Sequence, residues 1–466
     1  QKMRIKLDVN NMFAQAIGKE HGIKKEEVDS YQKEISNMHQ KIQKDKKEGK
    51  MGFMELPYLK QELVSDIEQY AQDKKGEIEN FVILGIGGSA LGSIALKTAL
   101  KDPYYNLNND EETPRLFIPD NVDPVRLRSL LDSLDLEKTV FNVISKSGGT
   151  AETMSQFLIA REAVVKKLGE ENLSKHFIAT TSKDSGYLIR IAKKEGFKTY
   201  HIPENVGGRF SVLTPVGLVF AAFGGIDIKG LLAGARYMDQ LCQTDKIWEN
   251  PAYLNGLLQY LAYQDGKVMS VMMPYAHQLK DVADWYRQLW AESLGKEMNR
   301  QGDIVNVGPT PIKALGATDQ HSQAQLYMEG PFDKIITFLE VEDYGTEIEI
   351  PEAYSEIEGV SYLGGHTLNK LIKTEKNATE LALTKRERLN NTIILPEVNE
   401  FTMGQLFYML ELQTALVGEL FDINAFNQPG VELGKHYTYG VLGRNGYDEM
   451  KNEYQNRPSK DKNFIV

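Results

Sequence analysis

The chain has 466 residues, of which 41% are hydrophobic and 26% are charged, and its formal net charge is −11. This composition is ordinary for a globular protein with two or three domain-sized cores. The acidic balance argues against a nucleic-acid binder, because phosphate backbones are held by clustered Lys and Arg. The single cysteine, Cys242, rules out an intramolecular disulfide framework. No apolar run approaches the roughly 20 residues of a membrane span, and no signal-peptide core is visible, so we expect a cytoplasmic protein.

The first 76 residues are predicted to form a helical segment. Residues 24–50 are polar, rich in lysine and free of proline, which is typical of a solvated helix with little core of its own. Such a helix needs a partner, and we expect the segment to pack on the second of two domains.

From residue 77 onward the sequence alternates between strand-like and helix-like stretches. The predicted strands are 81–84, 115–120, 139–145, 176–180, 198–203, 267–275, 334–341 and 391–397, and the helices in the second half are 282–295, 319–328 and 403–421. Strands that alternate with helices predict mostly parallel sheets sandwiched by helices. We therefore predict an α/β protein with two such domains, 77–230 and 231–424, followed by a C-terminal segment, 425–466.

A glycine-rich turn, "GIGGSALG", follows the first predicted strand of this α/β region. Gly85, Gly87 and Ala90 match the G-x-G-x-x-G/A fingerprint of dinucleotide-binding proteins. That fingerprint also needs an acidic residue about 20 positions further on, whereas the candidate, Asp120, lies 30 positions after Ala90. A plain tight turn or a site for a smaller phosphate fits equally well.

A second turn of similar character, "SKSGGTAET", follows the predicted strand 139–145. It gathers four hydroxyl side chains, one lysine and a pair of glycines within nine residues. In the simplest interpretation Thr150 caps the following helix and Glu152 complements the helix dipole. Because one cap needs only one hydroxyl, we favour a compact phosphate cradle built from both turns.

The best candidates for residues with a role in acid–base chemistry lie in a predicted helix and in a loop. Gln288 and Glu292 lie four residues apart, on one face of the helix 282–295, and a carboxylate among tryptophans is suited to act as a general base. The alternative for Glu292 is a solvated carboxylate near a helix end. Arg209, in "NVGGRFSV", is either a surface ion-pair partner or a cation held at the edge of a cleft.

The remaining motifs favour a protein without metal or nucleotide. His321 is one of eight histidines, and a lone histidine is more often structural than catalytic. The sequence has no H-E-x-x-H motif and no cysteine pair, so we predict no metal site. "GVELGK", residues 430–435, is one residue short of a Walker A motif, and His436 follows where Ser or Thr would bind magnesium, which disfavours ATP chemistry.

With these residues taken together, the chain resembles the phosphoglucose isomerase family from about Asn80 to Lys435. "VGGRFSVLTPVGL" and "FNQPGVELGK" resemble the two signatures of the family, and "GIGGSALG", "SKSGGTAET", "ESLGKE" and "GATDQHSQ" resemble further segments in the expected order. The resemblance implies two flavodoxin-like sugar-isomerase (SIS) domains, a homodimer, and no cofactor. It also implies reversible isomerisation of glucose 6-phosphate and fructose 6-phosphate through a cis-enediol, a step of glycolysis and gluconeogenesis.

The resemblance also assigns roles to individual residues. Glu292 would move the proton between C2 and C1, Arg209 would stabilise the enediolate, and His321 and Lys435 would serve ring opening. The residues that would bind the substrate and its 6-phosphate are Gly88, Ser89, Ser145, Lys146, Ser147, Thr150, Gln288 and Gln428. Glu152 would hold a histidine, His321, that comes from the neighbouring subunit.

The sequence differs from the family motifs at two positions, and it leaves three alternative functions open. Ser147 stands where some relatives have threonine, and Asn427 stands where the signature usually has aspartate. The first alternative is another SIS-type aldose–ketose isomerase, or one that also acts on mannose 6-phosphate. The others are a non-catalytic sugar-phosphate regulator of the same fold and an NAD-dependent dehydrogenase.

Overall fold

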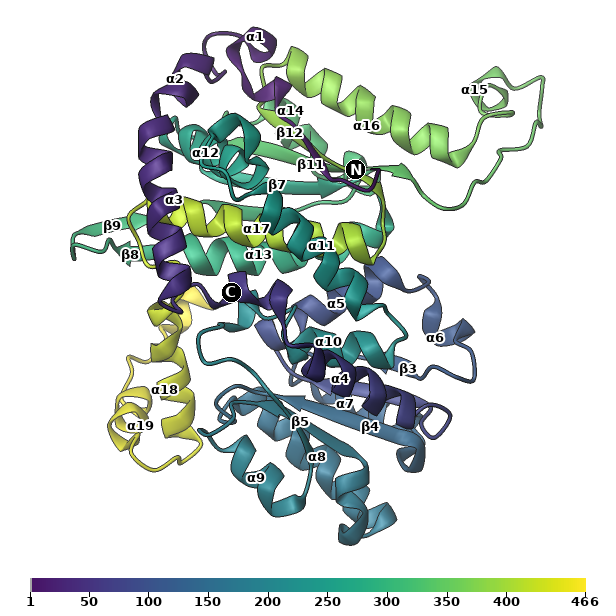
Figure 1. Ribbon diagram of the computed structural model, residues 1–466, viewed down its shortest axis with the longest axis vertical. Helices are drawn as coiled ribbons and strands as arrows, with labels where there is room; N and C mark the ends of the chain where they lie inside the picture. The colour runs from purple at the N-terminus through teal and green to yellow at the C-terminus, as the bar shows by residue number, and fades with distance from the viewer. Residues whose placement is uncertain (1) are drawn as a thin grey trace.

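The computed structural model describes residues 2–466 and places two α/β units one above the other along its longest axis (Figure 1). The lower unit contains the first sheet and the upper unit the second. The last two helices, α18 (Glu432–Val441) and α19 (Asp448–Gln455), lie beside the lower unit. None of the helices in residues 2–466 is both long enough and apolar enough to span a membrane.

The first sheet is fully parallel and has the strand order β3-β2-β4-β5-β6. Its strands are β2 (Asn80–Leu84), β3 (Arg115–Phe117), β4 (Thr139–Ile144), β5 (Phe177–Thr181) and β6 (Lys198–His201). Counted within the unit this order is 2-1-3-4-5, the flavodoxin-like order, whereas the dinucleotide-binding fold has 3-2-1-4-5-6. The match to the dinucleotide fingerprint therefore occurs in a sheet of another topology.

Helices cover both faces of this sheet. One face carries α4 (Gln61–Asp73), α5 (Leu91–Leu100) and α10 (Pro215–Phe223), and the other carries α7 (Pro124–Ser133), α8 (Ala151–Leu168) and α9 (Leu188–Glu195). Phe81 stacks on Phe223 on the first face, and Phe157 packs edge-on against Phe177 on the second. Because α5 follows β2 and α8 follows β4 on opposite faces, the sheet has its switch point between these strands, where ligands bind in such folds.

The second sheet has the same strand order as the first, except that its fifth strand comes from the N-terminus and is antiparallel. Its strands run β10 (Thr310–Lys313), β7 (Met269–Pro274), β11 (Lys334–Asp343), β12 (Asn390–Glu397) and β1 (Lys6–Asp8). The first four are parallel and give the order 2-1-3-4, while β1 pairs antiparallel with β12 in the fifth place. The prediction of two mostly parallel sheets sandwiched by helices is thus confirmed.

The core of the second unit is centred on one helix, α17 (Glu400–Leu420), whose residues 402–419 are all buried. It packs against α11 (Ile228–Leu241), α12 (Pro251–Gln264) and α13 (Lys280–Leu294). A helix that is buried on every side is expected to be mostly apolar, and more of the buried residues of α17 are apolar than polar. The other face of the sheet carries α14 (Ala324–Glu329) and α16 (Leu368–Lys385).

The N-terminal segment differs from the expectation in two ways. It contributes the strand β1 as well as helices, and it contacts both units. The helices α1 (Ala14–Ile17), α2 (Lys25–Ser30) and α3 (Gln32–Lys47) lie along the second unit, where Lys41 pairs with Glu419 of α17 at 3.1 Å. In contrast, α4 packs on α10 of the first unit, because its buried residues Val64 and Ile67 face the core shared with that helix.

Short elements complete the chain. They are α6 (Tyr105–Asn108), the antiparallel pair β8 (Lys296–Met298) and β9 (Ile304–Val307), and α15 (Glu358–Ser361), which lies in an arm that projects from the second unit (Figure 1). The helix predicted over 319–328 is broken into the 3-10 turn η9 (Thr318–His321) and α14. The expected limits of the two domains stay a prediction, and α11 crosses the limit at residue 230.

Candidate active site

The two glycine-rich turns lie at the switch point of the first sheet. In the turn after β4, the Thr150 hydroxyl bonds the Ser145 hydroxyl at 2.9 Å, and the Gly148 N–H donates to Ser145 Oγ at 2.9 Å. Thr150 occupies the N-cap position of α8, but its side chain caps no backbone N–H there. The capping interpretation of this turn is therefore wrong, and the hydroxyls bond within the turn itself.

Two glycines allow the loops of this region to meet closely. A Cβ on Gly88 would lie 2.2 Å from the backbone carbon of Gly208, so the turn after β2 rests directly on the loop that carries Arg209. Gly148 has φ +71°, and a Cβ there would lie 2.0 Å from the backbone nitrogen of Leu188. Any other residue at either position would push two loops of the site apart.

Arg209 is buried and fixed by four hydrogen bonds, with 3% of its side chain exposed. Its Nε donates to Ser293 Oγ at 2.7 Å, and Nη1 donates to Gln428 Oε1 at 2.9 Å. Nη2 donates to the carbonyls of Ala425 at 2.6 Å and Asn427 at 3.2 Å. Burial lowers the pKa of Arg209. The bond to residue 427 uses the backbone carbonyl, which asparagine and aspartate share, so the departure from the signature leaves this contact intact.

The carboxylate of Glu292 lies beside this guanidinium. Arg209 Nη1 and Glu292 Oε2 are 3.8 Å apart, and Gln288 Nε2 donates to the same oxygen at 3.0 Å. The Glu292 side chain keeps 27% of its surface exposed. The site thus presents a partly exposed carboxylate backed by a buried cation, an arrangement suited to a proton transfer with a developing oxyanion.

A cavity of about 830 Å³ opens in front of Glu292. It is bounded by the last turns of α13, by the residues that follow it, and by the segment around η10 (Pro429–Val431). Among its lining residues are Gln288, Glu292, Lys296, Arg300 and Gln428. The turn after β2 reaches this place as well, because a Cβ on Gly87 would lie 3.5 Å from Gln288 Nε2.

Other predicted site residues lie nearby but make different contacts. Lys146 Nζ donates to the carbonyls of Glu204 at 2.6 Å and Val206 at 3.1 Å, so it supports the loop that leads to Arg209. Burial lowers the pKa of Lys146. Lys435, on α18, is half exposed and pairs with Glu432 at 3.2 Å.

His321 does not line the Glu292 cavity of its own chain. It is exposed at the end of η9, which follows β10 of the second unit. Across residues 2–466, no hydrogen bond joins it to Glu152 or to a residue that lines the Glu292 cavity. Glu152 itself is in the first turn of α8, beside the hydroxyl-rich turn.

The sequence interpretation missed two side chains of the site, Ser293 and Lys296. Ser293 receives the Nε–H of Arg209, and Lys296 Nζ donates to the carbonyls of Glu292 at 2.7 Å and Ser293 at 2.9 Å. Both follow Glu292 closely in "ESLGKE". The spacing of four residues between Glu292 and Lys296 could have indicated the second.

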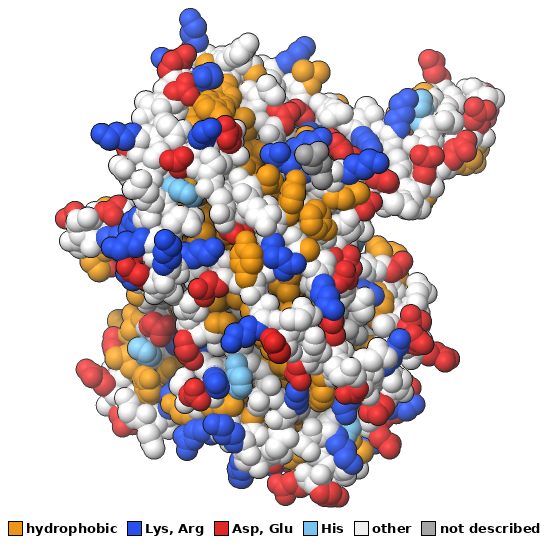
Figure 2. All heavy atoms as spheres, in the orientation of Figure 1, with side chains coloured by type: hydrophobic (Ala, Val, Ile, Leu, Met, Phe, Trp, Pro, Cys, Tyr) orange, Lys and Arg blue, Asp and Glu red, His pale blue; other side chains and the backbone are white. Residues whose placement is uncertain are grey.

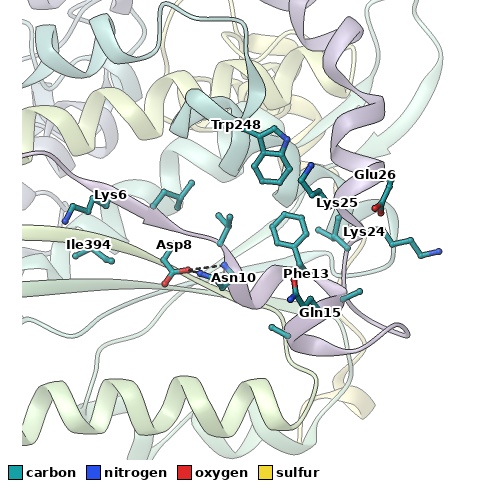
Figure 3. Close-up of a pocket in the computed structure, with 15 residues that line it drawn as sticks. Lys6, Asp8, Asn10, Phe13, Gln15, Lys24, Lys25, Glu26, Trp248 and Ile394 are labelled. Atoms are coloured by element: carbon teal, nitrogen blue, oxygen red, sulfur yellow. Dashed lines mark hydrogen bonds between the residues drawn. The ribbon is translucent and has the colours of Figure 1, made fainter.

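A larger cavity of about 960 Å³ lies elsewhere, beside β1 (Figure 3). Its labelled residues include Lys6, Asp8, Phe13 and Trp248, and no predicted site residue lines it. Within residues 2–466, three potential metal ligands, Glu20, His21 and Glu387, gather in one place. They do not line the Glu292 cavity either.

The chain is similar to a known family and to solved structures. The model of the family described as phosphoglucose isomerase matches residues 59–459. A glucose-6-phosphate isomerase of Carboxydothermus hydrogenoformans is 49% identical over 466 residues, which is 100% of both chains. The crystal structure of a hypothetical protein from Thermus thermophilus has a TM-score of 0.84 and 36% identity, covering 94% of this chain and 100% of that one.

A crystal structure of a glucose-6-phosphate isomerase from Chlamydia trachomatis has a TM-score of 0.73 and 25% identity. The match covers 84% of this chain and 75% of that one. The family model and the full-length relative span the switch-point turns, the Arg209 loop and α13, which together form the site described above. The chain belongs to the phosphoglucose isomerase family.

Proposed function

We propose that the chain interconverts glucose 6-phosphate and fructose 6-phosphate, with Glu292 as the base and Arg209 as the fixed cation. The support is its membership of the phosphoglucose isomerase family and its similarity to relatives named glucose-6-phosphate isomerase. The observation that carries the proposal is the approach of Arg209 Nη1 to Glu292 Oε2 at 3.8 Å, in front of a cavity.

The chemistry of an aldose–ketose isomerisation needs few groups. The proton moves between neighbouring carbons, C2 and C1, so one carboxylate on one face of the cis-enediol both removes and returns it. General acid–base catalysis contributes about 10²- to 10⁴-fold. Arg209 would stabilise the negative oxygen of the enediolate, and its four hydrogen bonds hold it in place before the charge develops.

The 6-phosphate would bind at the switch point, between the turns after β2 and β4. Backbone N–H groups and hydroxyls in such turns are suited to an anion. We assign this role to Gly88, Ser89, Ser145, Ser147 and Thr150. Gln288 would join them from α13. Lys146 would add a positive charge while it keeps the Arg209 loop in position.

Opening of the sugar ring would use Lys435 and His321, with Gln428 between the ring and Arg209. Because His321 is exposed and lies outside the Glu292 cavity, we propose that it serves the site of a second copy, where Glu152 would hold its ring. The active form would then be a homodimer. A symmetric dimer buries the same patch on both copies.

Exposed apolar side chains support this assembly. In the segment around α18, Val431 is 45% exposed, Leu433 56% and Leu442 74%, and Figure 2 shows hydrophobic side chains gathered where α18 and α19 lie. The arm that contains α15 exposes Ile348, Tyr354, Ile357, Val360 and Tyr362. Apolar groups on a projecting arm and next to an active site indicate surfaces that a partner covers.

The proposal is tested by removing the base alone. Glu292→Gln keeps the shape of the side chain but cannot accept the proton, so we expect kcat to fall by about 10³-fold or more while sugar-phosphate binding persists. The measurement is a coupled assay of fructose 6-phosphate conversion, with glucose 6-phosphate binding followed by thermal shift. Glu162→Gln, on an exposed face of α8, is the matched control. Wild-type turnover in Glu292→Gln would contradict the proposal.

A further inference from the structure

Lys296 lies where α13 ends, and the reaction described above does not use it. The residue is 9% exposed and lines the Glu292 cavity. The Gly295 N–H bonds the Ala291 carbonyl at 2.9 Å, and the Lys296 ammonium donates to the next two carbonyls, those of Glu292 and Ser293, at 2.7 and 2.9 Å. A helix end leaves such carbonyls without intrahelical partners, and a cation there also favours the helix dipole.

The two residues that Lys296 holds carry the chemistry of the site. Glu292 bears the proposed base, and Ser293 Oγ accepts the Nε–H of Arg209 at 2.7 Å. One ammonium therefore fixes the backbone of the base and the backbone of the residue that anchors the cation. If it were lost, the last turn of α13 would have two unpaired carbonyls, and Glu292 and Ser293 could shift independently.

We propose that Lys296 is a positioning residue of this site, whose ammonium holds the last turn of α13 so that Glu292 and Arg209 keep their mutual geometry. The proposal rests on the proposed function, because it takes Glu292 as the base. Lys296 acts through these two residues and is given no contact with the substrate.

The charges around Lys296 give this role a pH dependence. Burial, followed by the charge of Arg209, lowers the pKa of Lys296 to about 8, and Glu292 opposes both effects. Of the other charged groups that line the cavity, Arg300 is held by Glu419 at 2.7 and 2.8 Å, and Arg287 pairs with Asp284 at 2.5 Å. Glu297, the residue next in the chain, is exposed. Below about pH 8 the ammonium is charged, and as pH rises through this value the charge that attracts the helix carbonyls is lost.

The experiment compares Lys296→Met and Lys296→Arg with the wild-type enzyme. We expect Lys296→Met to lower kcat by about 10- to 100-fold, the effect of misplacing a catalytic group by about 1 Å, with KM changed far less. We expect the wild-type kcat to decline above about pH 8, and we expect this decline to disappear in Lys296→Met. Lys296→Arg should recover most of the activity and move the decline upward, because a guanidinium stays charged over this range.

A buried lysine away from the cavity provides the control. Lys334→Met removes an 8% exposed lysine at the start of β11 and should leave kcat and its pH profile unchanged. A thermal-shift measurement of glucose 6-phosphate binding shows whether each variant is folded. If Lys296→Met does not fold, the pH profile of Lys296→Arg tests the positioning role. Wild-type kcat and an unchanged alkaline decline in the Lys296 variants would overturn the positioning role. An inactive wild-type enzyme would instead contradict the proposed function.

Discussion

At the scale of single residues, we expect the site to depend on the shape of Arg209 as much as on its charge. Lysine can replace the charge, but it cannot reach Ser293, Gln428 and the carbonyls around Ala425 at the same time. We expect Arg209→Lys to lower kcat by about 10²- to 10³-fold, the usual cost of losing a fixed group that stabilises an oxyanion. Steady-state kinetics would check this, with Arg388→Lys, a buried arginine outside the cavity, as the control. Unchanged kcat would mean that charge alone is sufficient.

Individual residues were predicted from the sequence where a short motif isolates them. Arg209 stands behind a pair of glycines, and Glu292 lies four residues after Gln288, so both could be chosen before the fold was known. Ser293 could not be chosen, and Lys296 only by its spacing of four residues from Glu292, because the importance of both depends on where α13 ends. The partners of Arg209 at 425–428 are more than 200 residues away in the sequence, and no local pattern connects them.

At the scale of elements, one close contact of the site is between the turn after β2 and the Arg209 loop. Ala in place of Gly88 would put its Cβ 2.2 Å from the Gly208 backbone, a distance that real structures do not contain. The turn after β2 would have to move away from the Arg209 loop. We expect Gly88→Ala to weaken glucose 6-phosphate binding and to lower the melting temperature.

The matched control for this change is the glycine beside the contact. Gly207 has open space around the position of a Cβ and φ −74°, so Gly207→Ala should fold and bind normally. Isothermal titration calorimetry and thermal melting on both variants give the comparison. Equal binding by the two variants would mean that the close contact between the turns does not matter.

Helices and strands could be predicted from the sequence where their own residues carry a clear pattern, and not where distant contacts specify them. The strands β2, β4 and β5 are buried on both faces, which gives continuous apolar runs that the sequence displays directly. The strands β1 and β10 contain no buried residue, so no apolar run marks them in the sequence. In addition, β1 is specified by its pairing with β12 near residue 393, a contact that no sequence window contains.

At the scale of the whole molecule, the proposed exchange of His321 can be tested by mixing two inactive variants. Glu292→Gln and His321→Ala should each be inactive alone. If the histidine is donated across the interface, a mixed dimer has one site in which both residues are mutated and one in which both are intact. If it acts within its own chain, every site of the mixed dimer lacks one group.

The expected activity follows from symmetric assembly. Random pairing of equal amounts gives mixed dimers in about half of the population, each with one intact site of two, so about a quarter of the wild-type activity should return. The two variants are unfolded together, refolded as a mixture, and assayed against each variant refolded alone, with size-exclusion chromatography to measure the dimer. A dimer that recovers no activity on mixing would show that His321 does not serve the site of a second copy.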